Sequence, residues 1–147
     1  MLPAQARLRR RNEFHAALHG GQRAGRRTMT VHVRPPQPAD IPPSAEPVTA
    51  TTLLPARAGF VVGRAVGGAV ARNLVRRRLR HLVRQRMHRL PAGTLLVIRA
   101  LPPSTSMSFA QLGAELDMAL GRALDKAQRE SQRQVSRGEP AATGGRR

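Results

Sequence analysis

One arginine-rich segment carries the side chains best suited to chemistry. Between Arg57 and Arg89 the sequence has ten arginines and no acidic residue, and most of them fall in the run AVARNLVRRRLRHLVR that begins at Ala69. Guanidinium groups bind phosphate through paired hydrogen bonds, and a rigid array of them suits the repeating phosphates of a nucleic acid. The first chemistry that the sequence indicates is therefore the binding of a polyanion.

The apolar residues of this run recur with the period of an α-helix. With about 100° of rotation per residue, one side of the helix holds Ala71, Val75, Leu79 and Leu82. The other side collects Arg72, Asn73, Arg76, Arg77, Arg80 and Arg84. Charged helix surfaces are often merely solvated, but acids and bases then usually pair at i,i+4. Because this surface carries one sign of charge only, we interpret it as a binding face.

The composition of the whole chain supports the same interpretation. The net charge is +18 over 147 residues, and every residue from Pro47 to Ala114 is neutral or basic. Such a charge attracts polyanions and makes their binding salt-dependent. No segment approaches the ~20 apolar residues of a membrane-spanning helix, so we expect no membrane partner, and no pattern implies a protein partner. The absence of cysteine and of an apolar signal segment predicts a cytoplasmic protein without disulfides.

Residues that could support catalysis by the protein itself are scattered. Glu115, Asp117 and Asp125 fall on one predicted helix, where we expect them to be solvated. His15 and His19 have the i,i+4 spacing of metal ligands, but no third ligand accompanies them. We therefore expect no catalytic residue and no metal site in the protein alone.

Helix signals frame the chain at both ends. Asn12 is the predicted N-cap of a first helix that ends at Gly20–Gly21, with Phe14, Ala17 and Leu18 on one face. Near the other end, Ser108 and Gln111 form a predicted capping box. The helix that follows carries an apolar stripe of Phe109, Leu112, Leu116, Leu120 and Leu124.

Three strands are predicted between these helices. Residues 28–33 alternate polar and apolar and predict a half-buried strand, and apolar runs at 58–62 and 94–100 predict two more. The order of elements indicates an α+β fold, a small single-domain α/β sandwich. Its short sheet would have a basic crossover helix and flanking N- and C-terminal helices.

Composition divides the chain into three parts. Residues 1–11 form a basic N-terminal arm and residues 12–131 form the domain, which includes a proline-rich loop at 35–55. Residues 132–147 are polar and glycine-rich, and we expect a disordered basic tail.

Of the three phenylalanines, Phe60 and Phe109 are expected in the core, whereas Phe14 is either a core residue or a ring that lines a groove.

Two segments carry a resemblance to a known family. The first is RLRRRNEF from Arg7, followed by GGQRAGRR, and the second is RAGFVVGRAVGGAVARNLVRRRLR from Arg57. Over residues 7–34 and 57–126 the chain resembles the bacterial ribonuclease P protein component. In that family the protein assists a catalytic RNA that removes the 5′ leader of precursor tRNA. The resemblance thus implies the protein subunit of a tRNA-processing endoribonuclease, with a left-handed βαβ crossover in its fold.

The resemblance also assigns residues. The RNA-facing motif corresponds to Arg72, Asn73, Arg76, Arg77 and Arg80, and to these we add Arg64 in the glycine-rich turn and Arg84 on the same helix. The cleft for the leader corresponds to Phe14, Leu18 and His32. Leu74 stands where the motif has arginine, so Arg77 or Arg78 would have to supply that contact. We expect Mg²⁺ to be held mainly by the catalytic RNA, with Asn73 a candidate to lie near it.

Two other functions remain open for a small, basic, cysteine-free chain. One is a structural ribosomal protein that binds ribosomal RNA, and the other is a nucleoid DNA-binding protein. The nucleic acid that copurifies with the protein would separate the three.

Overall fold

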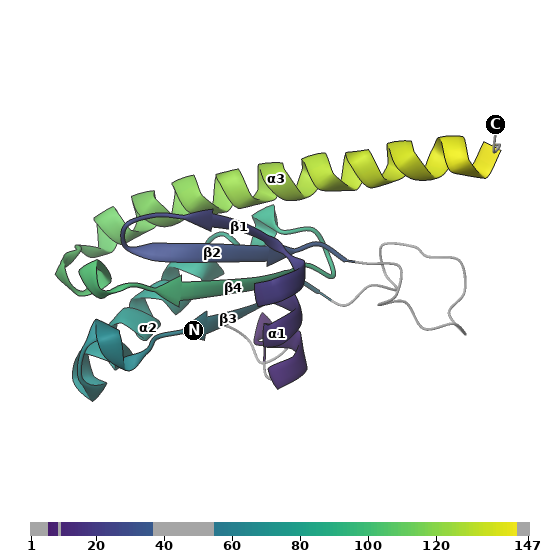
Figure 1. Ribbon diagram of the computed structural model, residues 1–147. Helices are drawn as coiled ribbons and strands as arrows, with labels where there is room; N and C mark the ends of the chain where they lie inside the picture. The colour runs from purple at the N-terminus through teal and green to yellow at the C-terminus, as the bar shows by residue number, and fades with distance from the viewer. Residues whose placement is uncertain (1–5, 9, 37–54, 144–147) are drawn as a thin grey trace.

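The computed structural model describes residues 6–8, 10–36 and 55–143 (Figure 1). The proline-rich loop expected at 35–55 therefore lies outside the described residues except at its two ends. In chain order the elements are α1 (Arg11–Gly20), β1 (Gln22–Gly25), β2 (Met29–Arg34), β3 (Arg57–Val61), α2 (Ala69–Arg84), β4 (Leu95–Ala100) and α3 (Phe109–Thr143). Short 3₁₀ turns are η4 (Arg64–Val66), η5 (Met87–Arg89) and η6 (Pro102–Ser106).

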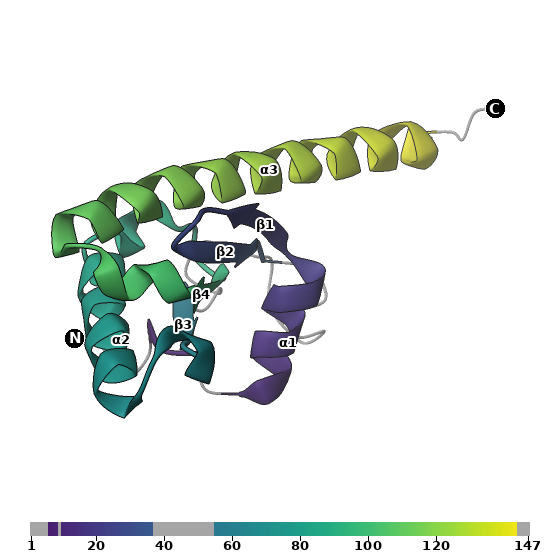
Figure 2. The same ribbon diagram turned by 60° about the vertical axis from the view of Figure 1, so that its left-hand side comes forward.

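The strands form one sheet in the order β1-β2-β4-β3. β2 pairs antiparallel with both β1 and β4, whereas β3 pairs parallel with β4 and is joined to it through α2. α3 and α2 pack on one side of the sheet and α1 on the other (Figure 2). This arrangement confirms the α+β sandwich. β1 was not predicted, because its four residues QRAG are too short and too polar to show strand periodicity.

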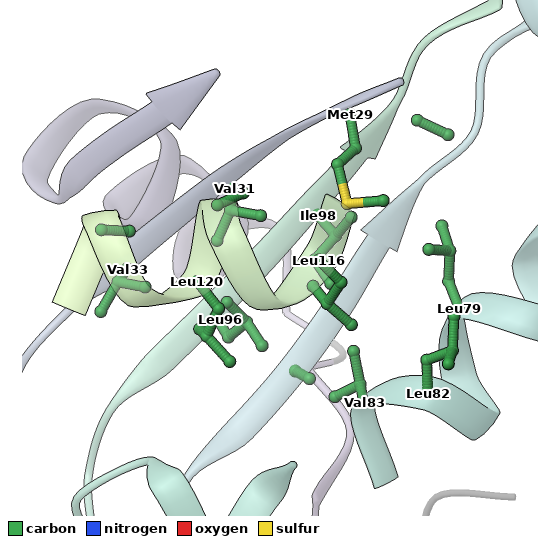
Figure 3. Packing of buried hydrophobic residues seen from close by; sticks show 14 of the residues in the cluster. Met29, Val31, Val33, Leu79, Leu82, Val83, Leu96, Ile98, Leu116 and Leu120 are labelled. Atoms are coloured by element: carbon green, nitrogen blue, oxygen red, sulfur yellow. The ribbon is translucent and has the colours of Figure 1, made fainter. Parts of the chain in front are cut away.

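The main core lies between the sheet and the pair α2 and α3 (Figure 3). Its largest fully buried side chains include Met29, Val31 and Val33 of β2, Leu96 and Ile98 of β4, Leu79 of α2, and Leu116 and Leu120 of α3. The other face of β2 is covered as well, so Thr30 and His32 are each only 7% exposed. The prediction that this strand is half-buried is therefore wrong, since α1 packs over the face that was expected to meet solvent.

A second, smaller cluster fills the space beneath α1. Leu8, Ala17, Leu95 and Val97 are buried there, with Phe14, Leu18 and Val61 packed against them. Leu8 comes from the expected N-terminal arm, and its N–H donates to the carbonyl of Ala58 in β3 (2.9 Å). Residues 6–8 thus contact the sheet at its β3 edge.

The N-termini of α1 and α3 differ in how they are capped. α1 begins at Arg11 after an N-cap at Arg10 whose side chain makes no capping bond, so the prediction of Asn12 as N-cap is wrong. At α3 the Ser108 Oγ accepts from the N–H of Gln111 (3.1 Å), and the Gln111 side chain accepts from the N–H of Ser108 (2.8 Å). The predicted capping box is therefore confirmed.

α3 departs from prediction at both ends. Leu112, Leu116 and Leu120 are buried as expected, but Phe109 is 38% exposed and its ring lies 5.5 Å from that of His81. The expectation that Phe109 is core is wrong, because it precedes the part of the helix that lies on the sheet. The helix also continues to Thr143 and extends past the sheet (Figure 1). The prediction of a disordered tail from residue 132 is therefore wrong for residues 132–143.

Two acids of α3 are not merely solvated as expected. Glu115 accepts from Arg26 in the β1–β2 turn (2.7 Å), and Asp117 accepts from Arg86 (2.6 Å) and Arg89 (3.1 Å) in the segment after α2. Hydrogen bonds from Arg26 lower the pKa of Glu115, and those from Arg86 lower the pKa of Asp117. The two carboxylates tie α3 to its neighbours on opposite flanks.

Candidate nucleic-acid interface

A glycine-containing turn sets the direction of the basic helix α2 relative to β3. β3 leads into η4, and Gly67 then adopts a φ of +154°, a backbone conformation in which a side chain would be strained. Gly68 is the N-cap, and α2 spans Ala69–Arg84 as the apolar periodicity predicts. Val75, Leu79, Leu82 and Val83 are its buried residues.

The polar residues of α2 fall into two rows. Asn73, Arg77 and Arg84 are exposed on the outermost side, whereas Arg72, Arg76 and Arg80 are half-buried along one flank. We call these six residues the α2 basic face. Nη1 of Arg76 donates to Oδ1 of Asn73 (3.4 Å), which connects the two rows. All six expected residues therefore lie on one surface. The row of Arg72, Arg76 and Arg80, the inner row, is more buried than the helical wheel alone suggested.

Positive charge is concentrated along the inner row. Burial lowers the pKa of Arg80, and the nearby Arg7 and Arg76 lower it further. Nε of Arg72 is buried and has no hydrogen-bond partner among the described residues. Cations held this close repel one another, and phosphate oxygens are the partners that would relieve that repulsion. Arg7 was not predicted here, because only the bridge between Arg7 and Ala58 of β3 brings the arm to this edge.

Arg78 and Arg77 differ in role although they are neighbours in sequence. Arg78 lies on the opposite flank of α2 and donates to the carbonyl of Met107 (3.2 Å), close to the start of α3. Arg77 is exposed on the outermost row. Of the two residues considered as a replacement for the arginine missing at Leu74, only Arg77 therefore points away from the protein.

The sheet face beneath α1 gathers the other expected site residues. Strand register aligns two rows across the sheet: Arg23, His32, Val97 and Gly59 in the first, and Gly25, Thr30, Arg99 and Val61 in the second. The ring of Phe14 lies directly on Gly59, where an added Cβ would overlap it. Leu18 packs against the same cluster. Phe14, Leu18 and His32, which the family resemblance assigned to one cleft, thus share one face, which we call the α1 face.

His32 is the most enclosed polar group of the α1 face. Burial lowers its pKa, and the positive charges of Arg23, Arg99 and His19 lower it further. His32 is therefore neutral near pH 7, and its buried Nδ1 has no hydrogen-bond partner among the described residues. Phe14 and Leu18 are both partly buried, so Phe14 packs against the sheet without being fully enclosed.

Two arginines of the α1 face were missed by sequence reasoning. Arg23 and Arg99 are exposed and lie on either side of His32. Arg23 belongs to the unpredicted strand β1, which explains its omission. Arg99 carried a usable signal, because it is the one charged residue in the apolar strand Leu95–Ala100. Arg64 is also exposed and lies in η4, which connects β3 to α2 in the chain.

The chemistry available at these surfaces is the neutralisation of phosphates. Within residues 6–8, 10–36 and 55–143 there is no group of three or more His, Asp or Glu side chains placed to hold a metal ion. The helices of this part of the chain are also too short or too polar to cross a membrane. The two surfaces therefore offer many positively charged arginine side chains, the partly buried ring of Phe14 and the neutral imidazole of His32.

Comparison with known proteins agrees with this chemistry. A family model described as Ribonuclease P matches residues 2–124. A relative from Salinispora tropica, named ribonuclease P protein component, is 51% identical over 127 residues, with 84% of this chain and 93% of the relative covered. A relative of the same name from Streptomyces griseus is 52% identical over 124 residues, with 84% and 96% covered.

Solved structures support the fold. The RNase P protein of Staphylococcus aureus superposes with a TM-score of 0.63 at 20% identity, covering 80% of this chain and 94% of the other. The RNase P protein of Thermotoga maritima, in complex with 1-(4-fluorophenyl)-2-thiourea, gives a TM-score of 0.57 at 22% identity, covering 75% and 92%. These matches do not support a ribosomal or a nucleoid protein.

Proposed function

The chain belongs to the ribonuclease P protein family, and from this premise we propose that the α2 basic face binds the catalytic RNA while the α1 face holds the 5′ leader of precursor tRNA. Membership makes the chain the protein subunit of a ribonucleoprotein enzyme of tRNA processing. The proposal concerns which RNA each surface contacts. A precursor tRNA substrate also implies that the protein acts in the cytoplasm.

The observation that carries the proposal is that the α2 basic face has only positive charges. The six residues of the α2 basic face include five arginines and no acid, and Arg7 adds a further positive charge beside Arg80. The face lies at the β3 edge, on the side of the sheet opposite α1. A large folded RNA offers the dense phosphates that such a face requires.

The α1 face suits a single strand better than a duplex. Phe14 is only partly buried, and Arg23 and Arg99, on either side of His32, are placed to contact phosphates. Bases of a single strand stack on aromatic rings, whereas those of a duplex are already stacked on each other. The leader is the single-stranded part of the substrate, so we assign it to this face.

The experiment for α2 is the triple variant Arg76→Ala, Arg77→Ala and Arg80→Ala. Each lost phosphate contact should flatten the slope of log affinity against log salt by about 0.7–0.9, measured with the catalytic RNA. The helix should stay folded, since none of the three residues belongs to the buried set. An unchanged slope in a folded triple variant would remove the α2 basic face from the proposal.

The experiment for the α1 face is Phe14→Ala. Stacking of one base on a ring contributes about 1–3 kcal/mol, so affinity for precursor tRNA should fall more than affinity for mature tRNA. Equal losses for both RNAs would mean that Phe14 acts only through packing.

We place the cleavage chemistry in the RNA, with Mg²⁺ held mainly there. The proposal rests on the side chains present: Asn73, the candidate neighbour of an RNA-bound ion, offers one amide oxygen that already accepts from Arg76. We expect the isolated protein to leave precursor tRNA intact, and the protein with its catalytic RNA and Mg²⁺ to produce mature 5′ ends. Cleavage by RNA-free protein would contradict this assignment.

A further inference from the structure

A second basic surface lies on α3, largely beyond the part matched by the family model. Arg122, Lys126, Arg129 and Arg133 are exposed and follow one another at i, i+4, i+7 and i+11, so they share one side of the helix. We call these four residues the α3 flank. Three of them lie past residue 124, where the family match ends.

The α3 flank faces the β1 edge of the sheet. Glu115 lies two turns before Arg122 on the same side of α3, and it bonds to Arg26 in the β1–β2 turn. Nζ of Lys126 donates to the carbonyl oxygen of Arg23 in β1 (2.7 Å). α1, by contrast, contacts β2 and β4 from the other side of the sheet.

Positive charge on this side exceeds the acids that could neutralise it. Glu115 is engaged by Arg26, and Glu130 reaches Arg133 only at 4.0 Å. Asp125 is the other acid beside the flank. Cations at i,i+3 and i,i+4 destabilise a helix by a few tenths of a kcal/mol per pair, and Arg23 and Arg27 add exposed charge at the neighbouring edge. The surface therefore has the character of a polyanion site.

The second row of the α1 face leads to this surface. The row runs across the sheet from Val61 in β3, through Arg99 and Thr30, to Gly25 in β1. Arg99 is exposed on it, and a Cβ placed at Gly25 would meet no atom within 4 Å. Thr30 itself is buried, so a strand of RNA that ran from Arg99 towards Gly25 would pass above it. Such a strand would leave the sheet at the β1 edge, beside Arg23 and the α3 flank.

We propose that the α3 flank, together with Arg23, binds the phosphates of the 5′-distal part of a long leader. This inference rests on the proposed leader site. α2 lies at the β3 side, so the cleavage junction lies on that side when α2 is on the catalytic RNA. The 5′ end of the leader then points towards β1. A short leader ends on the α1 face, and only a longer one reaches the flank.

The test is leader-length dependence in the holoenzyme. A flank variant carries Gln at all four positions (Arg122→Gln, Lys126→Gln, Arg129→Gln, Arg133→Gln), because Gln keeps good helix propensity. Precursor tRNAs carry leaders of about 4 or about 16 nucleotides, the range of single-strand site sizes on small domains. The variant should lose affinity for the long leader on the order of tenfold, with a salt slope flatter by about 0.7 per lost contact. Its affinity for the short leader should match that of the wild type.

Two controls separate position from net charge. Lysine in place of the three flank arginines keeps the charge and should keep the long-leader advantage. The pair Arg10→Gln and Arg11→Gln, exposed at the start of α1, removes as much charge as Arg129→Gln and Arg133→Gln. Only the latter pair should reduce long-leader affinity while leaving short-leader affinity unchanged. Circular dichroism checks that α3 stays helical. If the fourfold variant is not folded, the variant with only the exposed Arg129 and Arg133 replaced provides the answer.

Other outcomes overturn the inference. Unchanged affinity for the long leader in a folded variant would exclude the flank from leader binding. Equal losses for both leaders, or for mature tRNA, would mean that the flank contacts the tRNA body or the catalytic RNA instead. Failure of the proposed leader site itself is recognised separately, because Phe14→Ala would then leave the preference for precursor over mature tRNA intact.

Discussion

The ring of Phe14 lies on the backbone of Gly59, and a Cβ at that position would overlap the ring. This contact holds α1 against β3, and Phe14 as a whole remains only partly buried. Glycine at position 59 thus sets the height of the aromatic group above the sheet.

Gly59→Ala should therefore displace Phe14 and destabilise the protein by about 1–3 kcal/mol, the usual cost of overpacking. The severe overlap is with Phe14, and Leu8 is the next neighbour, with its Cβ 3.0 Å away. Combining Gly59→Ala with Phe14→Ala should therefore make the two effects clearly non-additive. Denaturant unfolding of both single variants and the double variant measures the coupling. Additive effects would show that the strain lies elsewhere.

Arg77→Ala and Arg78→Ala form a matched pair of neighbouring substitutions. Arg78 donates to Met107, and a hydrogen bond from a charged group contributes about 1.5–3 kcal/mol. Arg78→Ala should therefore lower stability more than it lowers RNA affinity, and Arg77→Ala should do the reverse. Thermal unfolding and RNA titration on the two variants decide this, and a reversal of the pattern would contradict the positions of these side chains on α2.

Phe109→Ala should have a small effect on folding compared with Leu112→Ala. Phe109 is 38% exposed, whereas Leu112 is fully buried, and truncating a buried leucine typically costs about 2–5 kcal/mol. The difference in unfolding free energy between the two variants is the measurement. A loss for Phe109→Ala as large as that for Leu112→Ala would place the ring in the core after all.

The free energy of unfolding should fall on acidification in two separate pH ranges, the first of which belongs to His32. Above its ordinary pKa of 6.5, His32 is neutral in both states and contributes no pH dependence. As the pH falls below 6.5 the unfolded chain binds the proton first, because the folded pKa is lowered, and stability declines. Each unit of lowering corresponds to about 1.4 kcal/mol.

The second range belongs to the carboxylates. The pKa values of Glu115 and Asp117 are lowered in the fold from 4.5 and 3.8, so their contribution is complete above those values and is lost as the pH falls through the folded ones. Unfolding free energies between pH 8 and pH 3 test both ranges. His32→Asn should remove the first decline only, and Glu115→Gln with Asp117→Asn should reduce the second only.

Much of this protein follows from local pattern. The bounds of α2 and the gathering of its arginines follow from helical period, because side chains three and four residues apart share a face whatever surrounds the helix. The capping box of Ser108 and Gln111 likewise depends only on two residues that are three positions apart. The sequence by itself therefore determined the α2 basic face and, through the Arg7 and Arg57 segments, the family.

Other features depend on contacts between distant segments. Only pairing across the sheet puts Arg23 and Arg99 beside His32, since strand register is set by hydrogen bonds between residues far apart in the chain. Packing on two faces buried β2 from Met29 to Val33, and the limited reach of the sheet left Phe109 exposed. Arg78 differs from Arg77 because one flank of α2 meets Met107 and the other side meets solvent. The tertiary structure decided these points because burial and electrostatic surroundings are properties of what packs against a residue, which local period does not encode.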